Sequence, residues 1–323
     1  MTRLVSDSLD VLTVGRVGVD LYAEEPGAGF TEARRFQKSV GGSPTNVAVA
    51  AARLGLRAAV FTKVGDDGLG EYVRIALAEQ FGVDTRFVGT HPSLPTPIVV
   101  AVMDPPDDPQ FLMYRAPRAP DATILPDEVD LEVVREVPVL WISGGALAVE
   151  PSRGTTRLLL AERRRRRHTV LDLDFRPVMW DSEEEARSEI GPALDSATVA
   201  IGNRRECEVA IGESEPDAAA DALLGHGVEL AIVKLGGDGV LVATAEERSV
   251  VPPVPVEVVS GLGAGDAFGG ALCYGLLSGK GPAEAVEFAN AAGALVASRL
   301  LCADAMPTER EVRDLLEATG ARR

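Results

Sequence analysis

Short aliphatic runs alternate with helical patterns along most of the chain. The runs are continuous in Val, Ile and Leu, whereas the stretches between them repeat apolar residues at helical spacing. Continuous apolar strands separated by helices are typical of a parallel sheet covered on both faces. The pattern therefore predicts one doubly wound, mostly parallel α/β domain over residues 1–323. The predicted strands are 10–15, 58–65, 138–145, 168–175, 197–203, 230–236 and 239–244, and the predicted helices include 44–55, 68–80, 151–165 and 216–225.

Two segments depart from this alternation. Residues 17–40 are polar with scattered aromatics, and residues 92–122 contain eight prolines around short apolar runs. Neither segment keeps a helical period, and structureless loops of this length are uncommon inside a compact domain. We therefore expect both segments to form strands of a small β-sheet that acts as a lid on the main domain.

Charge and composition narrow the classes of function. The formal net charge is −17, which repels phosphate backbones, so we expect no nucleic-acid partner. No apolar run reaches the roughly 18 to 20 residues that cross a bilayer, and the first residues lack a hydrophobic signal core, so we expect a cytoplasmic protein without membrane contact. Cys207, Cys273 and Cys302 are too widely separated to predict a disulfide framework or a metal site.

An unbroken basic run, Arg163 to Arg167, follows the predicted helix 151–165. Cations are favoured at the carboxyl end of a helix by its dipole. We therefore expect this run to be a solvated helix end on the surface.

Asp266 directly follows a glycine-rich loop in the stretch SGLGAGDAFGG, residues 260–270. A helical pattern begins at once, and backbone N–H groups at a helix start bind anions. An acid in this place can serve as a simple cap. It can also act as a base that takes a proton from a hydroxyl while the loop holds the phosphoryl group being transferred. Since no GxxxxGK[ST] loop occurs, the second interpretation predicts a phosphotransferase of another design.

Other polar residues lie where strands end and helices begin. Asn46, in GGSPTNVAVAAARLG at residues 41–55, offers both a donor and an acceptor at a helix start, as a ligand contact or as a cap. Asp20 follows the first strand, where doubly wound folds bind ligands. Asn203 and Glu206 lie one helical turn apart after a strand, which suits hydrated Mg²⁺ near phosphates and equally suits a capping box.

The segments GGSPTNVAVAAARLG and GAGDAF resemble the two signatures of the PfkB (ribokinase-like) family of sugar kinases, in the same order and with a similar separation. The resemblance extends over essentially the whole chain and implies a ribokinase-like fold, ATP and Mg²⁺ as cofactors, and a sugar or sugar acid as substrate. GRVGVDLY, LDLDFRPVMW and NAAGALVASRLLCADAMPT are similar to the 5-dehydro-2-deoxygluconokinase subfamily. This narrower likeness implies phosphorylation of the primary hydroxyl, at C6, of 5-dehydro-2-deoxy-D-gluconate in myo-inositol catabolism.

The resemblance also implies roles for individual residues. Asp266 would be the general base, and Asp20 would bind the sugar. Asn203 and Glu206 would face the ATP phosphates, with Glu206 holding Mg²⁺ through water. The remaining implied contacts are an anion hole from the N–H groups of Gly263, Ala264 and Gly265, sugar contacts from Gly42 and Asn46, and nucleotide contacts from Lys234, Gly236, Gly239 and Asn290.

An acid substrate needs a partner for its carboxylate. Family members that act on keto-deoxy sugar acids use a Tyr-Arg pair in the lid, which implies Tyr114 and Arg115 here. Arg118 and Arg176 are further candidates, since a guanidinium suits a carboxylate. For Arg176, a structural ion pair with one of the aspartates in DLDFRP is an equal alternative.

The same chemistry suits related substrates, so 2-keto-3-deoxygluconate, fructose and ribose remain alternatives. A nicotinamide-dependent dehydrogenase is disfavoured because the first strand lacks GxGxxG, and a non-catalytic sugar-binding regulator is disfavoured by the intact GAGD. The family's more common Asp-Thr before the glycines is Ser260-Gly261 here, so no K⁺ activation is expected. Lid sheets of the family often pair, which makes Val99, Val100 and Phe111 candidates for a homodimer contact.

Overall fold

The larger of two sheets contains every strand predicted for the main domain. The structure is a computed structural model that describes residues 8–106 and 108–320. Within these ranges the sheet has nine strands in the order β13-β12-β11-β10-β9-β8-β1-β4-β5. Neighbouring strands are parallel from β11 to β5, whereas β12 is antiparallel to both β11 and β13. The strands are β1 (Val11–Val14), β4 (Ala58–Gly65), β5 (Val88–His91), β8 (Val139–Ser143), β9 (Thr169–Asp172), β10 (Val199–Asn203), β11 (Leu230–Lys234), β12 (Val240–Ala243) and β13 (Arg248–Val251).

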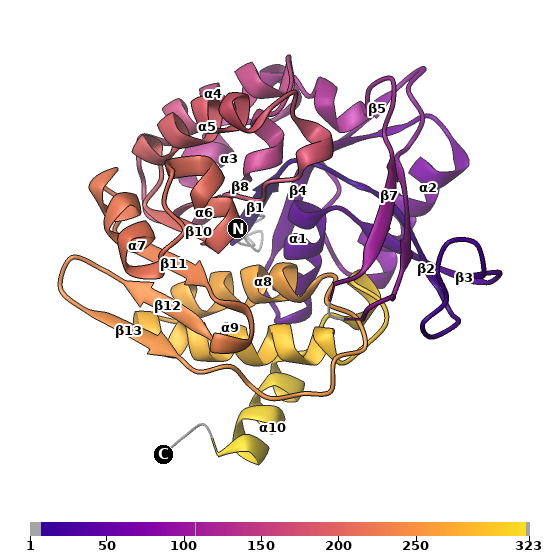
Figure 1. The fold of residues 1–323 in the computed structure, drawn as a ribbon. Helices are drawn as coiled ribbons and strands as arrows, with labels where there is room; N and C mark the ends of the chain where they lie inside the picture. Colours follow the sequence, from indigo (N-terminus) through magenta and orange to yellow (C-terminus); the bar gives the residue numbers. More distant parts are fainter. Residues whose placement is uncertain (1–7, 107, 321–323) are drawn as a thin grey trace, which may run out of the picture.

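Helices cover both faces of this sheet, as the sequence pattern predicts (Figure 1). Alternate residues of β1 show the division, because Val11 packs with α1, α8 and α9, whereas Leu12 and Val14 pack with the helices between β8 and β11. Among the described residues, no helix is long and apolar enough to span a membrane. The helices are α1 (Ser43–Arg53), α2 (Gly68–Ile75), α3 (Leu131–Glu136), α4 (Ser152–Arg163), α5 (Glu183–Ala193), α6 (Arg204–Ile211), α7 (Pro216–Gly225), α8 (Ala264–Leu277), α9 (Pro282–Ala297) and α10 (Glu309–Thr319).

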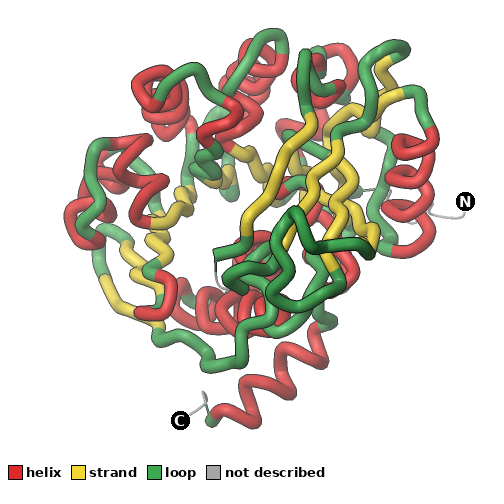
Figure 2. Tube along the Cα trace, turned by 45° about the vertical axis from the view of Figure 1, so that its right-hand side comes forward, coloured by secondary structure: helices red, strands yellow, loops and turns green. Residues whose placement is uncertain are grey.

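The two irregular segments form a second sheet, as expected. Its strands are β2 (Gly18–Ala23), β3 (Phe36–Gly41), β6 (Ile98–Val102) and β7 (Gln110–Tyr114), in the order β3-β2-β6-β7. The central pair, β2 and β6, is parallel, and the outer pairs are antiparallel. Figures 1 and 2 show this sheet at the side of the molecule away from β13. Segments far apart in the chain therefore meet in one small layer.

The prediction that the whole arginine run lies on the surface is wrong for Arg163. Residues 164–167 are exposed, but Arg163 is only 1% exposed. Its guanidinium donates hydrogen bonds to carbonyl groups at the ends of neighbouring elements, so its own buried donors are paired. The acceptors are the carbonyl oxygens of Val134, Arg135, Pro138 and His168 and the hydroxyl of Thr169. Burial of this charged side chain is tolerated because acceptors surround each nitrogen of the guanidinium.

Candidate active site

The start of α8 presents unpaired backbone donors. Gly263 precedes the helix with φ of 81°, a left-handed conformation that favours glycine. Among the described residues, no hydrogen-bond acceptor is found for the backbone N–H groups of Gly263, Ala264 or Gly265. The helix dipole adds positive potential at the same place. This geometry fits the anion hole that the sequence predicts.

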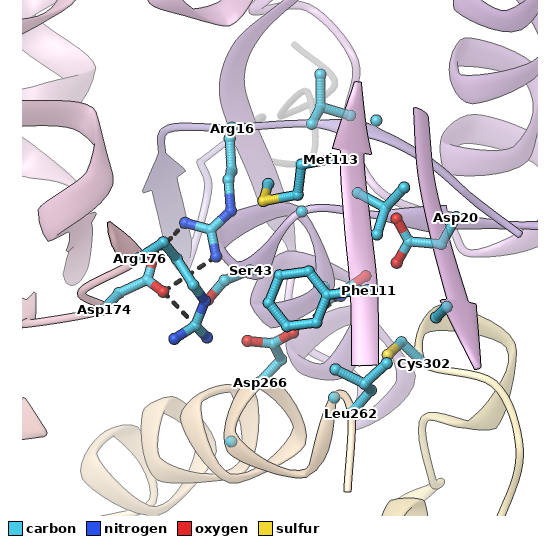
Figure 3. A pocket seen from close by; sticks show the side chains of 18 of the residues that line it. Arg16, Asp20, Ser43, Phe111, Met113, Asp174, Arg176, Leu262, Asp266 and Cys302 are labelled. Carbon is cyan, nitrogen blue, oxygen red and sulfur yellow. Dashed lines mark hydrogen bonds and ion pairs between the residues drawn. The ribbon is translucent and has the colours of Figure 1, made fainter. Parts of the chain in front are cut away.

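Asp266 lies in the first turn of α8 and faces a cavity (Figure 3). Asn46, in the first turn of α1, donates from Nδ2 to Asp266 Oδ2 at 2.8 Å. Burial raises the pKa of Asp266, although hydrogen bonds from Asn46 and Ser43 and the charge of Arg16 oppose that rise. A carboxylate with a raised pKa and a fixed orientation is suited to accept a proton.

Asp20 lies on β2, on the other side of the same cavity (Figure 3). The Tyr22 hydroxyl donates to Asp20 Oδ2 at 2.9 Å, whereas Asp20 Oδ1 is buried without a partner among the described residues. Burial raises the pKa of Asp20 to about 6, and the Tyr22 hydrogen bond opposes the rise. The carboxylate packs against Gly41, where any Cβ would lie 2.0 Å from Oδ1. Because Asp20 lines the first cavity and its Oδ1 has no partner among the described residues, this oxygen is a candidate acceptor for a ligand hydroxyl.

Arg16, which the sequence analysis did not single out, forms a buried ion pair beside this cavity. Its guanidinium contacts both oxygens of Asp174, and Ser143 also donates to Asp174. Arg176 lies 3.4 Å from Asp174 and 3.6 Å from Glu206. Despite burial, these cations lower the pKa of Asp174 to about 2, so Asp174 is ionised. The alternative of an ion pair for Arg176 is thus confirmed, while its side chain still lines the cavity.

The Glu206 carboxylate and the Lys234 ammonium lie close together, at the place where the sequence predicts a phosphate-bound cation. Glu206 is 4% exposed, and its Oε2 lies 3.8 Å from Lys234 Nζ. Asp172 Oδ1 is buried without a partner among the described residues, and burial raises the pKa of Asp172 to about 8. No group of three metal-ligating side chains occurs within residues 8–106 and 108–320. These residues fit a cation held mainly through water, as a hydrated Mg²⁺ is.

Asn203 itself serves as a helix cap. Its Oδ1 accepts from the Glu206 backbone N–H at 2.9 Å, and Glu206 Oε2 accepts from the Asn203 N–H at 2.7 Å. These two hydrogen bonds form a capping box, which was one of the two interpretations that the sequence allowed. Because the box fixes the Glu206 side chain, Asn203 orients that carboxylate toward Arg176 and Lys234.

A second cavity adjoins the first. Its walls are glycine-rich and apolar, and it shares Lys234, Gly261 and Gly265 with the first cavity. A Cβ on Gly265 would lie 3.7 Å from Lys234 Nζ, so the ammonium lies beside the start of α8. The Glu206 and Asp172 carboxylates raise the pKa of Lys234 against the effect of burial, so Lys234 is protonated. The two cavities therefore meet at the Lys234 ammonium and the start of α8.

The structure brings most of the predicted residues to these two cavities. The first is lined by Asp20, Gly42, Asn46, Arg115, Arg176, Glu206, Lys234, Gly263, Gly265 and Asp266, and the second by Lys234, Gly236, Gly239, Ala264, Gly265 and Asn290. Tyr114 and Asn203 line neither cavity, and Tyr114 is 61% exposed. Sequence reasoning missed Arg16 and Asp172. Their positions directly after β1 and at the end of β9 were the available signal.

The chain belongs to the pfkB family of carbohydrate kinases, whose family model matches residues 8–309. It is thus a kinase that transfers a phosphoryl group to a carbohydrate. Among curated relatives, it is 33% identical to a 5-dehydro-2-deoxygluconokinase of Geobacillus thermodenitrificans over 98% of this chain and 95% of the relative. It is 35% identical to that of Photobacterium profundum over 96% of this chain and 95% of the relative. A ribokinase II candidate from E. coli, solved with ATP and Mg²⁺, shares the fold with a TM-score of 0.87 and 25% identity, over 96% of this chain and 99% of that chain.

Proposed function

We propose that this kinase transfers the γ-phosphoryl group of ATP to the C6 hydroxyl of 5-dehydro-2-deoxy-D-gluconate, in the cytoplasm and as part of myo-inositol catabolism. The observation that carries the proposal is the position of Asp266. Its carboxylate faces the cavity that contains Asp20, within one helical turn of the Gly265 N–H, where the two cavities meet. The relatives named above support the choice of substrate.

The protein groups act as follows. Asp20 Oδ1 accepts from sugar hydroxyls and aligns the substrate. Asp266 takes the proton of the primary hydroxyl as that oxygen attacks phosphorus, while Asn46 keeps the carboxylate oriented. The N–H groups before and in the first turn of α8 stabilise the charge on the transferred group. Lys234 adds a fixed positive charge at the same point.

ATP is bound in the second cavity, along Gly236, Gly239 and Asn290. Glu206 would hold Mg²⁺ through water, and Asp172 presents a carboxyl oxygen without a partner among the described residues in the same cavity. The Mg²⁺ ion neutralises charge on the phosphates when bound. The four-stranded sheet acts as a lid that excludes water, since Phe111 and Met113 of β7 line the first cavity.

Lid pairing into a homodimer is also proposed. Leu112 and Tyr114 on β7 are exposed and line neither cavity, which supports an apolar contact between two copies. Phe111 is exposed too, but it lines the first cavity, so it contributes less than the sequence suggested. Val99 and Val100 are only half-exposed, and Val99 lines the cavity, so they contribute less than the sequence suggested. Sedimentation equilibrium tests this pairing.

The net charge of −17 supports the expectation of no nucleic-acid partner.

A coupled ADP-release assay with MgATP tests the proposed substrate. The panel contains 5-dehydro-2-deoxygluconate, 2-keto-3-deoxygluconate, fructose, ribose and adenosine. We expect kcat/KM to be highest, by about a hundredfold, for the first acid, since a lost charge-assisted contact costs roughly 1.5–3 kcal/mol. Preference for fructose or ribose would keep Asp266 as the base and overturn the substrate. No turnover with any compound would favour a sugar-binding regulator.

Arg115→Ala is expected to raise KM for a sugar acid by about tenfold or more, because Arg115 is the proposed carboxylate partner. Arg115 lines the first cavity and is ion-paired with Asp121, which orients its guanidinium. KM values for the acid and for a neutral sugar are measured side by side. Equal increases for both would remove Arg115 from the carboxylate role.

The KM for the sugar is expected to rise as the pH falls through about 6, where Asp20 becomes protonated and loses an acceptor. Tyr22→Phe removes the hydrogen bond that lowers the pKa of Asp20, so the midpoint should move to higher pH. The KM for MgATP, measured across the same pH range, is the control. A sugar KM that stays flat from pH 5 to 8 in both enzymes would contradict the role of Asp20.

A further inference from the structure

Cys302 carries a buried thiol in the wall of the first cavity, which also contains Asp20 (Figure 3). Two parts of the site meet at this thiol. The sulfur lies 2.8 Å from the hydroxyl of Tyr22, on strand β2 of the lid. It also packs against the loop before α8, since a Cβ on Gly263 would lie 2.6 Å from the sulfur. Cys302 therefore contacts both the sugar side and the phosphate side of the site.

The Tyr22 hydroxyl has two hydrogen-bond partners, although it carries only one proton. It lies 2.9 Å from Asp20 Oδ2 and 2.8 Å from Cys302 Sγ. Above its pKa of about 6, Asp20 is ionised and can only accept, and a hydrogen bond to a charged group is the stronger of the two. The tyrosine proton therefore goes to Asp20, and the tyrosine oxygen accepts from the thiol S–H.

The thiol keeps the proton that this arrangement requires. Burial raises the pKa of Cys302 well above its ordinary value, and the charges of Asp20 and Asp266 add to the rise. Burial and the Asp20 charge likewise raise the pKa of Tyr22. The hydrogen bonds thus run in one direction, from Cys302 through Tyr22 to Asp20. Because a hydroxyl that accepts a hydrogen bond is a stronger donor, the thiol strengthens the bond that holds Asp20.

One oxygen of Asp20 is left over from this series. Asp20 is 8% exposed, and its Oδ1 has no partner within residues 8–106 and 108–320. Tyr22 is fully buried in a small apolar cluster with Cys302, so its ring is fixed by packing. With Oδ2 held by Tyr22, the acceptor that remains for a ligand in the first cavity is Oδ1.

We propose that Cys302 is a positioning residue for sugar binding, whose thiol donates to Tyr22 and thereby holds Asp20 with Oδ1 left for a substrate hydroxyl. This role rests on the proposed function, in which Asp20 accepts from sugar hydroxyls. It needs no covalent chemistry at the sulfur. The contact with Gly263 offers a purely structural alternative, in which Cys302 supports the anion hole by packing and affects kcat.

Substitution of Cys302 tests the hydrogen bond from the thiol. Cys302→Ala removes the donor and is expected to raise KM for 5-dehydro-2-deoxygluconate by about threefold, while kcat and KM for MgATP stay within about twofold. Cys302→Ser keeps a donor and should recover most of the affinity. Cys273→Ala is the matched control, because Cys273 is also buried but lines neither cavity. A sugar KM that is unchanged in Cys302→Ala would overturn the proposal.

A double-mutant cycle with Tyr22→Phe separates positioning from packing. Without the Tyr22 hydroxyl the thiol is no longer connected to Asp20, so adding Cys302→Ala should leave the sugar KM of Tyr22→Phe unchanged. Additive effects of the two substitutions would instead assign Cys302 to packing. A loss of kcat in Cys302→Ala that exceeds the change in sugar KM would do the same.

The S–H stretching band of Cys302 tests the series in the resting enzyme, where no substrate is needed. Infrared difference spectra against Cys302→Ala assign the band. Because donating a hydrogen bond lowers the stretching frequency, Tyr22→Phe should move the band to higher frequency, and a band that does not move would overturn the series. Failure of the proposed substrate is distinguishable, since it would leave this shift intact while the unmodified enzyme failed to phosphorylate 5-dehydro-2-deoxygluconate.

Discussion

Replacing Asp266 by asparagine is expected to reduce kcat by about 10²- to 10⁴-fold, the contribution of a positioned general base. The amide has the same shape and can still accept from Asn46, which now donates to Asp266 at 2.8 Å. It cannot take the hydroxyl proton. The measurement is single-turnover phosphorylation of the sugar acid, together with calorimetric binding of ATP and of the acid, which should change little.

Asp314→Asn is the control for this substitution, because Asp314 is 64% exposed on α10, away from both cavities. A variant at Asp266 that retained more than about a tenth of the normal kcat would exclude its role as the base. Another residue of the first cavity would then have to be the base.

Gly263→Ala is expected to lower kcat by about 10²- to 10³-fold, the effect of losing donors from an anion hole. Gly263 has φ of 81°, and a Cβ there would lie 2.6 Å from Cys302 Sγ and 3.1 Å from Cys302 Cα. The loop must move, and its N–H groups move with it. Steady-state kinetics should show a loss in kcat larger than any change in the sugar KM.

Gly279→Ala separates this effect from simple backbone strain. Gly279 also has a positive φ, of 67°, but a Cβ there meets nothing within 4 Å. Both variants should lose thermal stability, and only Gly263→Ala should lose turnover. If kcat fell equally in the two variants, the anion-hole assignment would be wrong.

The strand and helix order was predictable because its signals are local. Continuous apolar runs marked the inner strands of the main sheet, and β9, β10 and β11 were predicted to within a few residues. The short edge strands β5 and β13 were missed, since each has four residues and is partly exposed. The small sheet was predicted from the absence of helical period, but its order β3-β2-β6-β7 comes from pairing between distant segments.

The candidate site was only partly predictable, for the same reason. GAGD marks a helix start with an acid in its first turn, and this motif lies within a few residues. The Asn46–Asp266 hydrogen bond joins positions 220 residues apart, and the Arg16–Asp174 pair joins positions 158 residues apart. No local pattern indicates such pairs.

Burial is the other property that local sequence hides. Arg163 and Arg164 are adjacent and identical in type, yet one is buried among carbonyl groups and the other is exposed. Tyr114 and Arg115 are adjacent on the lid, yet only the arginine lines the first cavity. In both cases the direction of the side chain and the neighbouring elements decide the outcome.

The sequence by itself determined the fold class, the phosphoryl-transfer motif and the family of this kinase. Each of these depends on short-range periodicity or on contiguous residues. Only the tertiary structure decided which charges face one another. It brought Arg16 to Asp174, gave Asp20 a buried oxygen without a partner among the described residues and paired Arg115 with Asp121. Coulombic and hydrogen-bond energies depend on distance in space and on burial, and neither is a function of separation along the chain.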